Sequence, residues 1–425
     1  ENNPLEDNSL KNYVVYDLEI SRLVANATED MGLSIKIIER TKNFFGLGLL
    51  YWMYGRPMEP TKSWLEKKFK NKPELIEANL RALQAGYNFG DITESFATQY
   101  EVGAAPLKAG TYRNIVGNYA TGLGLLAASQ LSKLPLFFGG YPITPASDIL
   151  HQLSHYKNYG VKTFQAEDEI SGIGSVVGAA FAGSLAVTAT SGPGIALKTE
   201  AIGLGVISEL PMVIINVQRG GPSTGLPTKT EQADLLMAMN GRNGESPIPI
   251  IAASTPGDCF YVAYEACRIA VKYMTPVFIL TDGFIANGSE PWMLPELDKL
   301  KDIKINEPEL RDGQFLPYER DEKTLGRSWA LPGLKGFEHR VGGLEREHIT
   351  GNINYDPDNH DLMVKLRAKK VSSIVDDIPK TEVYGKQTGE ILILGWGSTF
   401  GAIRSGVESL IEEGKSVSHV HLKWI

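Results

Sequence analysis

A carboxylate followed by small residues is the first candidate for chemistry in the sequence. Glu169 lies between an apolar segment, VKTFQ, and a stretch rich in small residues, ISGIGSVVGAAFAG. A carboxylate at the start of a helix can have a purely structural role, because the helix dipole stabilises negative charge there. However, four glycines would let this helix approach another backbone closely and bury the glutamate: Gly172, Gly174, Gly178 and Gly183. A buried carboxyl group has a raised pKa and can share a proton with a heterocyclic nitrogen.

An arginine and a glycine-rich turn follow two other apolar segments. Arg219 ends PMVIINVQ and precedes two glycines. Its guanidinium can form a bidentate hydrogen bond with a carboxylate. The alternative is an ordinary surface arginine without a ligand. The turn SGPG, Ser191 to Gly194, follows SLAVTAT. Its glycines permit an unusual backbone path, and N–H groups at a helix start can face a ligand, although an ordinary turn would also use glycine.

The elements that carry these residues predict one sheet. From about Asn118, short apolar strands alternate with helices rich in glycine and alanine. This alternation predicts an α/β fold with an open, doubly wound, mostly parallel sheet. The expected strands are 134–141, 161–167, 184–190, 211–219, 247–254 and 275–283. Ligands of such sheets bind beyond the carboxyl ends of the strands, where YPITP (141–145), Glu169, Ser191 and Arg219 are expected.

Three further parts flank the predicted sheet domain, 111–290. Residues 1–110 are mostly helical in pattern, residues 291–388 are rich in charge, Pro, Gly and Asn and predict an extended arm, and residues 389–425 begin a new strand–helix–strand unit. The first residue is Glu1 rather than Met, and the last unit stops early. We therefore infer a fragment, a disordered terminus left out, or a nicked chain.

The N-terminal part contains the most apolar run, Phe44–Tyr54. It is much shorter than the roughly 20 residues of a membrane span, so we interpret it as a buried helix. In LIEANLRAL, apolar residues at i, i+4 and i+7 predict an amphipathic helix that ends near Gly86.

Composition limits the class of protein. A chain of 425 residues is too long for one ordinary core, so two or three domains are expected. With 43% hydrophobic and 22% charged residues and a net charge of −8, a globular protein is expected, without a nucleic acid or membrane partner. No signal pattern is present at the start of the sequence, so a cytoplasmic location is the default.

The sequence offers no metal site of its own. Cys259 and Cys267 cannot ligate an iron–sulfur cluster by themselves and are interpreted as buried small hydrophobes. In TDG, Asp282 and Gly283 end an apolar strand, with Asn287 only a few residues later, so a strand-ending turn is favoured over a magnesium site. The glycines of GWGSTFG, 395–401, favour helix packing on a strand over NAD binding, and His360 is expected in a loop.

Four motifs in order carry a resemblance to a known family: YPITP, AEDEISGIGSVVGAAFAG, TATSGPG and QRGGPSTGLPTKTEQADL. The chain resembles the α subunits of 2-oxoacid:ferredoxin oxidoreductases, most of all those of the 2-oxoglutarate enzymes. This implies a thiamine-diphosphate (TPP) pyrimidine-binding domain at 111–290. Residues 1–110 are similar to the later part of a fused γ domain, whose usual glycine-rich opening strand is missing here. Residues 389–425 resemble the start of a transketolase C-terminal-like domain.

The resemblance also implies site residues. Glu169 would activate the aminopyrimidine ring, and Thr144 and Arg219 would hold the substrate carboxylate. Thr228 and Lys229 would lie near the substrate, and a second carboxylate would need a donor such as Lys229 or Arg242. The residues expected to bind the cofactor are Tyr141, Pro142, Ile143, Glu169, Ser191 and Gly192.

The implied function is oxidative decarboxylation of 2-oxoglutarate, or a related 2-oxoacid, to the acyl-CoA, with electrons passed to ferredoxin. A β subunit would bring Mg²⁺, the diphosphate contacts and a [4Fe–4S] cluster in an (αβ)2 assembly. The TSGPG turn is also similar to acetolactate synthases, so non-oxidative TPP chemistry is one alternative. A non-catalytic assembly subunit is another.

Overall fold

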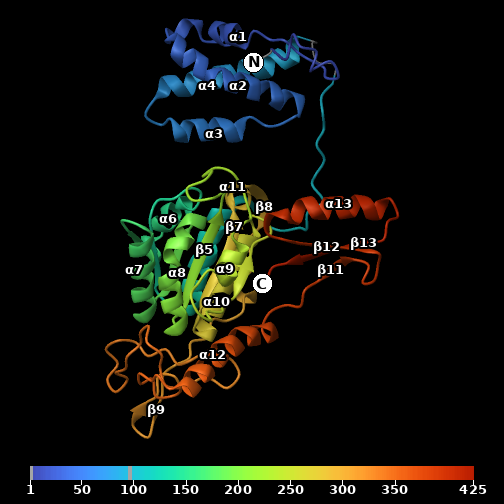
Figure 1. Cartoon of the computed structure of the whole chain (residues 1–425). Helices are drawn as coiled ribbons and strands as arrows, with labels where there is room; N and C mark the ends of the chain where they lie inside the picture. The colour runs from blue at the N-terminus through green and yellow to red at the C-terminus, as the bar shows by residue number, and fades with distance from the viewer. Residues whose placement is uncertain (1–2, 94–97) are drawn as a thin grey trace. The chain divides into compact units, whose positions relative to one another are not determined.

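The computed structural model describes residues 3–93 and 98–425 (Figure 1). The chain divides between Ala109 and Gly110 into two compact units, and each is described by itself. Among the described residues, no helix is both long enough and apolar enough to cross a membrane.

The N-terminal unit consists of helices. They are α1 (Ile20–Ala27), α2 (Ile35–Met53), α3 (Glu59–Lys68) and α4 (Pro73–Ile92). Helices α2 and α4 cross so closely that a Cβ added at Gly86 would lie 1.9 Å from the Phe45 carbonyl oxygen. The predicted helix end near Gly86 is therefore wrong. Helix α4 continues to Ile92, and Gly86 allows the backbone of α2 to approach because it has no side chain.

The apolar run in α2 is only half-buried. Phe45 is buried, whereas Leu50 and Tyr54 are exposed. The predicted helix is therefore buried on one face only, which packs on α1 and α4, while the other face lies on the surface of this unit.

The larger unit contains a six-stranded parallel sheet, in the order β3-β2-β4-β5-β7-β6. This confirms the predicted fold class. The strands are β2 (Leu136–Gly140), β3 (Lys162–Gln165), β4 (Leu185–Thr190), β5 (Met212–Gln218), β6 (Ile250–Ala252) and β7 (Pro276–Asp282). Strands β4, β5 and β7 are buried along their whole length, as expected when helices cover both faces.

Helices cover the two faces of the sheet as separate layers. Val213 and Ile215 of β5 belong to the core under one layer of helices, and Met212 and Ile214 belong to the core under the other. The first layer contains α5 (Gly117–Ser132), α6 (Ser147–Ser154) and α10 (Asp258–Tyr273). The second contains α7 (Glu169–Phe181) and α8 (Gly192–Ile207).

The strand order reverses next to β2. The chain runs from β2 to its neighbour β3 and then returns to β4 on the other side of β2. At such a switch point the connections leave in opposite directions and open a crevice at the carboxyl ends of the strands. The segments that begin at Tyr141 and Ser191 lie at this point.

The arm, residues 291–388, is not wholly extended. Strand β8 (Ser289–Met293) pairs with β1 (Tyr112–Val116), and β9 (Leu310–Arg311) pairs with β10 (Gln314–Phe315). A 16-residue helix, α12 (Pro357–Ser372), then follows in the orange part of Figure 1. The Asp356 carboxylate caps it by accepting from Asp358 N and Asn359 N at 2.9 and 3.1 Å. His360 therefore lies on a helix and not in a loop, which corrects that prediction.

The last part of the chain forms a small sheet, in the order β11-β13-β12. Its elements are β11 (Val383–Gly385), β12 (Ile391–Trp396), α13 (Phe400–Glu412) and β13 (Val417–Leu422). A Cβ added at Gly395 would lie 2.4 Å from the Ile403 side chain, so this glycine serves helix packing on a strand, as predicted.

A buried ion cluster joins the arm to the sheet. Glu209, directly after α8, bonds with Arg320 of the arm and with Lys370 of α12. Burial alone would raise the pKa of Glu209, but the charges of Lys370 and Arg320 outweigh it and lower that pKa to about 2. The carboxylate therefore stays ionised at neutral pH and ties three segments that are far apart in the sequence.

Candidate functional site

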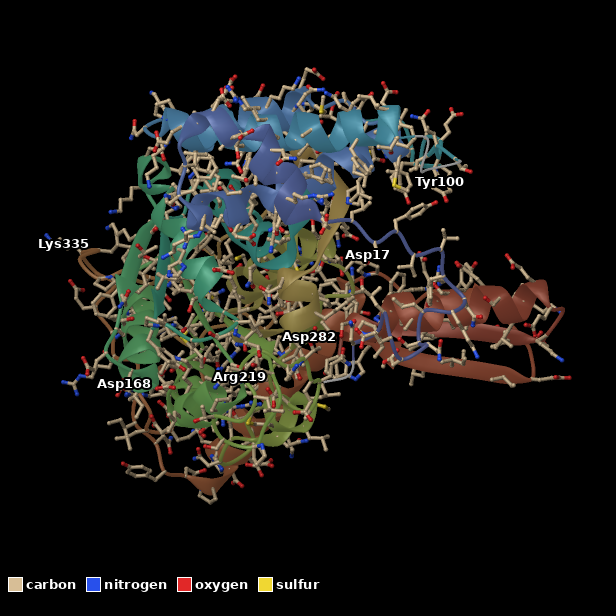
Figure 2. All side chains as sticks on the ribbon, turned by 90° about the horizontal axis from the view of Figure 1, so that it is seen from above. Asp17, Tyr100, Asp168, Arg219, Asp282 and Lys335 are labelled. Atoms are coloured by element: carbon tan, nitrogen blue, oxygen red, sulfur yellow. The ribbon has the colours of Figure 1, made fainter. Side chains whose placement is uncertain are left out.

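Side chains from four connections meet at the carboxyl edge of the sheet. The Tyr141 hydroxyl, after β2, lies 3.0 Å from Oγ1 of Thr190, at the end of β4. Arg219, after β5, donates from Nη1 to the main-chain oxygen of Thr144 at 2.6 Å. Figure 2 labels Arg219, directly after β5, Asp282, the last residue of β7, and Asp168, in the turn between β3 and α7. The predicted convergence of these segments is thus present in the fold.

Glu169 is the first residue of α7, and its side chain is half-buried. The preceding Asp168 caps the helix by accepting from Ser171 N at 2.8 Å. Glu169 does not have to cap its own helix, so its carboxylate is available to other groups. Burial, and then the neighbouring Glu169 carboxylate, raise the pKa of Tyr141 well above its usual range. The phenol therefore stays protonated beside the carboxylate.

The glycines of α7 do not share one role. A Cβ added at Gly172 would lie 3.5 Å from Gly140 Cα, so this residue faces the sheet. Gly174 and Gly178 are exposed and have open space around them. Next to them, Ile170 is 59% exposed. The close interface expected along this helix stays a prediction.

Lys198 is a site residue that sequence reasoning missed. It lies on α8, is fully buried, and donates from Nζ to the main-chain oxygen of Glu169 at 2.7 Å. Its ammonium also lies 5.3 Å from the Tyr141 ring centroid. The available signal was its spacing, because Lys198 stands between the buried residues Ile195 and Ile202 at i+3 and i+4 on the apolar face of a helix.

Lys198 makes a testable contribution to the pH dependence of stability. Burial lowers the pKa of Lys198 from 10.5 to about 8, against the opposing charges of Glu169 and Asp168. Between pH 8 and 10.5 the folded state has released this proton and the unfolded state has not, so stability rises with pH in that window, by up to about 3 kcal/mol. In urea unfolding at several pH values, the difference in stability between the wild type and Lys198→Met should rise across this window, because the contribution of Lys370, whose pKa burial also lowers to about 8, is common to both proteins and cancels. An equal rise in the variant would contradict the assignment.

The SGPG turn packs so closely against neighbouring side chains that two of its positions admit only glycine. A Cβ added at Gly192 would lie 2.8 Å from an oxygen of the Asp234 carboxylate, and one at Gly194 would lie 1.9 Å from Thr190 Oγ1. Ser191, at the N-cap of α8, is fully buried, and its hydroxyl has no protein partner. A buried hydroxyl without a partner is expected to bond with a ligand or water.

Asp234 is a second residue that sequence reasoning left without a role, although its motif was noted. Its carboxylate accepts from Asn216 Nδ2 at 2.9 Å, and its main-chain N–H donates to Gln218 Oε1 at 3.1 Å. Burial raises the pKa of Asp234. This acid therefore holds the loop that follows Arg219 against strand β5.

Arg219 is a buried arginine, not a surface one. It is 8% exposed, and besides Thr144 it donates from Nη2 to the main-chain oxygen of Thr224 at 3.0 Å. Its Nε has no protein partner. In the described part of the chain, no carboxylate forms an ion pair with it. The guanidinium thus positions two loops and keeps a positive charge that a carboxylate ligand could balance.

The remaining predicted residues are more exposed. The side chains of Pro142 and Thr144 are exposed, that of Ile143 is half-buried, and Thr228 and Lys229 are exposed in the loop after β5. The structure thus brings Thr144 to Arg219 through its main chain and leaves Lys229 open to solvent.

Arg242 does not suit a substrate carboxylate. Its guanidinium donates to the main-chain oxygens of Ala238, Met239 and Ser246 at 2.8–3.1 Å. These bonds close the turn after α9 (Leu235–Asn240), so the suggestion that Arg242 binds a second carboxylate is not supported.

The predictions about thiols and the TDG turn agree with the structure. Cys259 and Cys267 are buried free thiols on α10. Asp282 caps the short helix α11 (Gly283–Asn287) by accepting from Phe284 N and Ile285 N at 2.8 and 3.2 Å. Across residues 3–93 and 98–425, no group of three or more His, Cys, Asp and Glu side chains could hold a metal ion.

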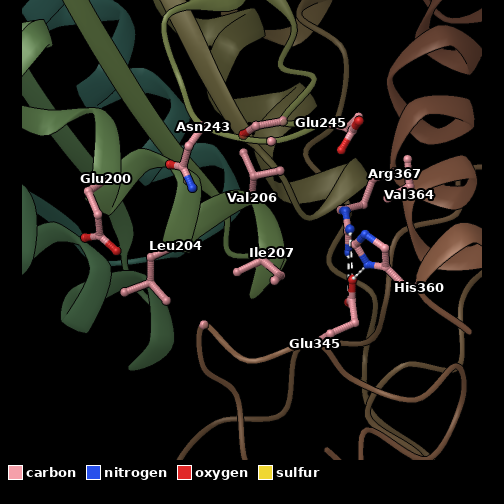
Figure 3. Close-up of a pocket in the computed structure, with 14 residues that line it drawn as sticks. Glu200, Leu204, Val206, Ile207, Asn243, Glu245, Glu345, His360, Val364 and Arg367 are labelled. Carbon is pink, nitrogen blue, oxygen red and sulfur yellow. Dashed lines mark hydrogen bonds and ion pairs between the residues drawn. The ribbon is translucent and has the colours of Figure 1, made fainter. Parts of the chain in front are cut away.

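A cavity of about 280 Å³ lies away from these residues, beside the C-terminal half of α8 (Figure 3). Arg367 of α12 contacts both oxygens of Glu345 at 3.2 Å, and His360 Nδ1 lies 2.7 Å from the same carboxylate. Burial would raise the pKa of Glu345, but Arg367 and His360 lower it. The Arg367–Glu345 ion pair and the His360 contact hold the segment around Glu345 on α12, so we assign these side chains a structural role.

Fold and site together define a doubly wound α/β protein with a carboxylate, a protonated tyrosine and a buried arginine at its switch point. Residues 130–354 match the family of the thiamine-diphosphate-binding domain of pyruvate flavodoxin/ferredoxin oxidoreductases. Residues 3–89 match a second family, pyruvate ferredoxin/flavodoxin oxidoreductase. The chain therefore belongs to the pyruvate flavodoxin/ferredoxin oxidoreductase family, which confirms the resemblance seen in its motifs.

Individual relatives carry more specific names. The chain is 53% identical to the 2-oxoglutarate oxidoreductase subunit KorA of Mycobacterium tuberculosis, over 100% of this chain and 64% of that protein. It is 34% identical to the 2-oxoglutarate synthase subunit KorA of Archaeoglobus fulgidus, over 68% of this chain and 75% of the relative. The chain thus spans less than two thirds of the length of the mycobacterial protein.

A solved structure shares the fold. It is the 2-oxoglutarate:ferredoxin oxidoreductase of Magnetococcus marinus with 2-oxoglutarate, coenzyme A and succinyl-CoA bound. It matches 94% of this chain and 68% of its own chain with a TM-score of 0.82 and 34% identity.

Proposed function

We propose that this chain is part of the α subunit of a TPP-dependent 2-oxoacid:ferredoxin oxidoreductase that decarboxylates 2-oxoglutarate oxidatively to the acyl-CoA. The observation that carries the proposal is Arg219, a buried cation that has no acidic partner among the described residues and lies at the same sheet edge as Glu169. A 2-oxoacid would bring the missing negative charge. The names of the relatives from Mycobacterium tuberculosis and Magnetococcus marinus support 2-oxoglutarate as the substrate.

The residues at the switch point fit the aminopyrimidine half of TPP. The buried Ser191 hydroxyl has no partner among the described residues, and the glycines of the SGPG turn let its backbone pack closely against Asp234 and Thr190. Tyr141, Pro142, Ile143, Ser191 and Gly192 would hold this half of the cofactor. When bound, TPP supplies an electron sink for decarboxylation.

Glu169 would hold and move a proton. Its carboxyl oxygen would exchange a proton with a nitrogen of the aminopyrimidine ring, while Tyr141 stays protonated beside it. The Lys198 ammonium donates to the main-chain oxygen of Glu169 and would thereby help to position its carboxylate.

Arg219 and Thr144 would orient the substrate. The guanidinium of Arg219, held by two main-chain oxygens, would bind the carboxylate next to the keto group. The exposed Thr228 and Lys229 would lie on the open side, and Lys229 is the cation left there for a second carboxylate.

The remaining parts of the enzyme would come from partners. We propose a β subunit that brings Mg²⁺, the diphosphate contacts and a [4Fe–4S] cluster, in an (αβ)2 assembly that uses coenzyme A and ferredoxin in the cytoplasm. The exposed face of α7, with Ile170, Gly174 and Gly178, would suit the contact with this subunit.

A reconstitution experiment tests the proposal. The full-length chain is co-expressed with its partner subunit, and reduction of a viologen dye is measured with 2-oxoglutarate or pyruvate, each with and without coenzyme A. We expect reduction that requires 2-oxoglutarate, coenzyme A and TPP. Decarboxylation by a colourless protein without an electron acceptor would instead indicate non-oxidative chemistry of the acetolactate synthase type. A complex that binds no TPP would indicate a non-catalytic assembly subunit.

A further inference from the structure

The buried charges of the arm do not balance. Three arm arginines, Arg320, Arg327 and Arg346, lie near Tyr318, and Lys370 of α12 shares the Glu209 carboxylate with Arg320. The acidic partner of Arg320 and Lys370 is Glu209. Arg327 donates to the main-chain oxygens of Glu209 and Ser328 at 3.2 and 3.1 Å. Two cations thus pair with the Glu209 carboxylate, whereas Arg327 and Arg346 form no ion pair within the described part of the chain.

Arg346 is the least satisfied of these cations. It is 6% exposed, and its Nη1 lies 3.5 Å from the Gly351 carbonyl oxygen, at the long limit of a hydrogen bond. Its Nε is buried without a partner. The adjacent carboxylate of Glu345 is engaged by Arg367 and His360. A buried guanidinium in this state is destabilising unless an anion accompanies it.

A cavity of about 360 Å³ adjoins Arg346, and Arg340, His339, Thr350 and Asn352 also line it. The carboxylate of Glu338, which shares the lining, accepts a hydrogen bond from Gly336 N at 3.0 Å. Two arginines and one carboxylate therefore line this cavity, which leaves one positive charge in excess.

His339 restricts what can bind. Burial lowers the pKa of His339 below its usual value of 6.5, so the ring is neutral at pH 7 and above. Its Nδ1 lies 2.8 Å from the Phe337 carbonyl oxygen and must donate to it. Nε2 is then an acceptor, and it is buried without a partner. A ligand that satisfies both residues carries negative oxygens for Arg346 and an O–H group for His339.

We propose that the cavity lined by Arg340, Arg346 and His339 binds a phosphate group that carries one proton. Its charged oxygens accept from the two arginines, and its P–O–H donates to His339 Nε2. Carboxylate and sulfate ions lack this hydroxyl at neutral pH. The cavity is larger than a phosphate ion, so the group belongs either to free phosphate or to a small phosphomonoester.

Ligand-dependent thermal unfolding tests the site. The full-length protein, assembled with its partner, is heated in phosphate, glycerol 3-phosphate, sulfate or chloride at pH 7 and equal ionic strength. Phosphate or glycerol 3-phosphate should raise Tm in a saturable way, and the more effective of the two identifies the source of the group. Equal Tm values in phosphate and chloride, or in phosphate and sulfate, would overturn the proposal.

Substitutions locate the effect. Arg346→Gln should weaken phosphate binding roughly tenfold to hundredfold, the usual loss for a charge-assisted hydrogen bond. Because Arg346 is buried and its variant could fail to fold, the exposed Arg340→Gln is measured as well, by calorimetric titration with phosphate. Arg311→Gln is the control, since Arg311 lies in the arm but pairs with Glu319 and does not line the cavity. Unchanged affinity in Arg340→Gln, or an equal loss in Arg311→Gln, would contradict the assignment.

Discussion

Substituting Glu169 with Gln is expected to lower 2-oxoglutarate-dependent turnover of the reconstituted enzyme by about 10²–10⁴-fold, the usual contribution of a positioned acid or base. Glutamine keeps the size and hydrogen-bonding capacity of the side chain but cannot release a proton. The fold should be unaffected, because Asp168 and not Glu169 caps α7. Viologen reduction under saturating substrate measures the effect.

Two comparisons make this prediction specific to Glu169. Glu167→Gln, on an exposed residue two positions earlier, serves as the control and should keep near-normal turnover. Thermal unfolding of Glu169→Gln should match that of the wild type. If Glu169→Gln retained more than about a tenth of wild-type turnover, the proton-transfer role would be refuted.

Replacing Glu209 by Gln is expected to destabilise the larger unit by about 3–5 kcal/mol, the usual cost of removing one partner from a buried ion pair. The substitution leaves Arg320 and Lys370 buried without their shared carboxylate. It also removes a negative charge that offsets the burial of Arg327, because Glu209 favours the charged form of that guanidinium. Urea unfolding at pH 7 measures the loss. Because the chain has two compact units, the unfolding transition of the larger unit has to be resolved from that of the N-terminal unit.

Acid unfolding provides an independent measurement of the same carboxylate. The pKa of Glu209 falls from 4.5 to about 2 on folding, so its stabilising contribution is complete above pH 4.5 and is lost as the pH falls toward 2. Glu209→Gln should remove this part of the acid sensitivity. Glu200→Gln, on the exposed side of α8, is the matched control and should cost less than about 0.5 kcal/mol. A loss below about 1 kcal/mol for Glu209→Gln would show that the cluster tolerates its charge imbalance.

The positions of Glu169, Ser191 and Arg219 at strand ends were predictable because they depend on local pattern. Apolar runs of strand length alternate with helical stretches, and parallel strands place their carboxyl ends on the same edge. The caps of α12 were also present in the sequence as Asp356 and Pro357. This helix was missed because the surrounding charge and glycine content predict an arm without regular structure.

Tertiary structure alone decided which charges are buried. Lys198, Glu209 and Arg346 are ordinary charged residues in the sequence, and nothing local distinguishes them from surface residues except the helical spacing around Lys198. Glu209 is satisfied by Arg320 and Lys370, which lie 111 and 161 positions away. A charge can be buried only where distant segments bring donors or opposite charges to it.

The same reasoning applies to Gly86 and to the candidate site. Gly86 ends no helix, because its role depends on the approach of Phe45 from another helix. The sequence by itself determined the family, the sheet and the residues at its carboxyl edge, since these follow from local periodicity and motif order. Only the fold decided that Arg219 is buried, that Arg242 closes a turn and that Lys198 bonds to the main chain of Glu169. Burial and hydrogen bonding of this kind depend on the contacts that the folded chain makes.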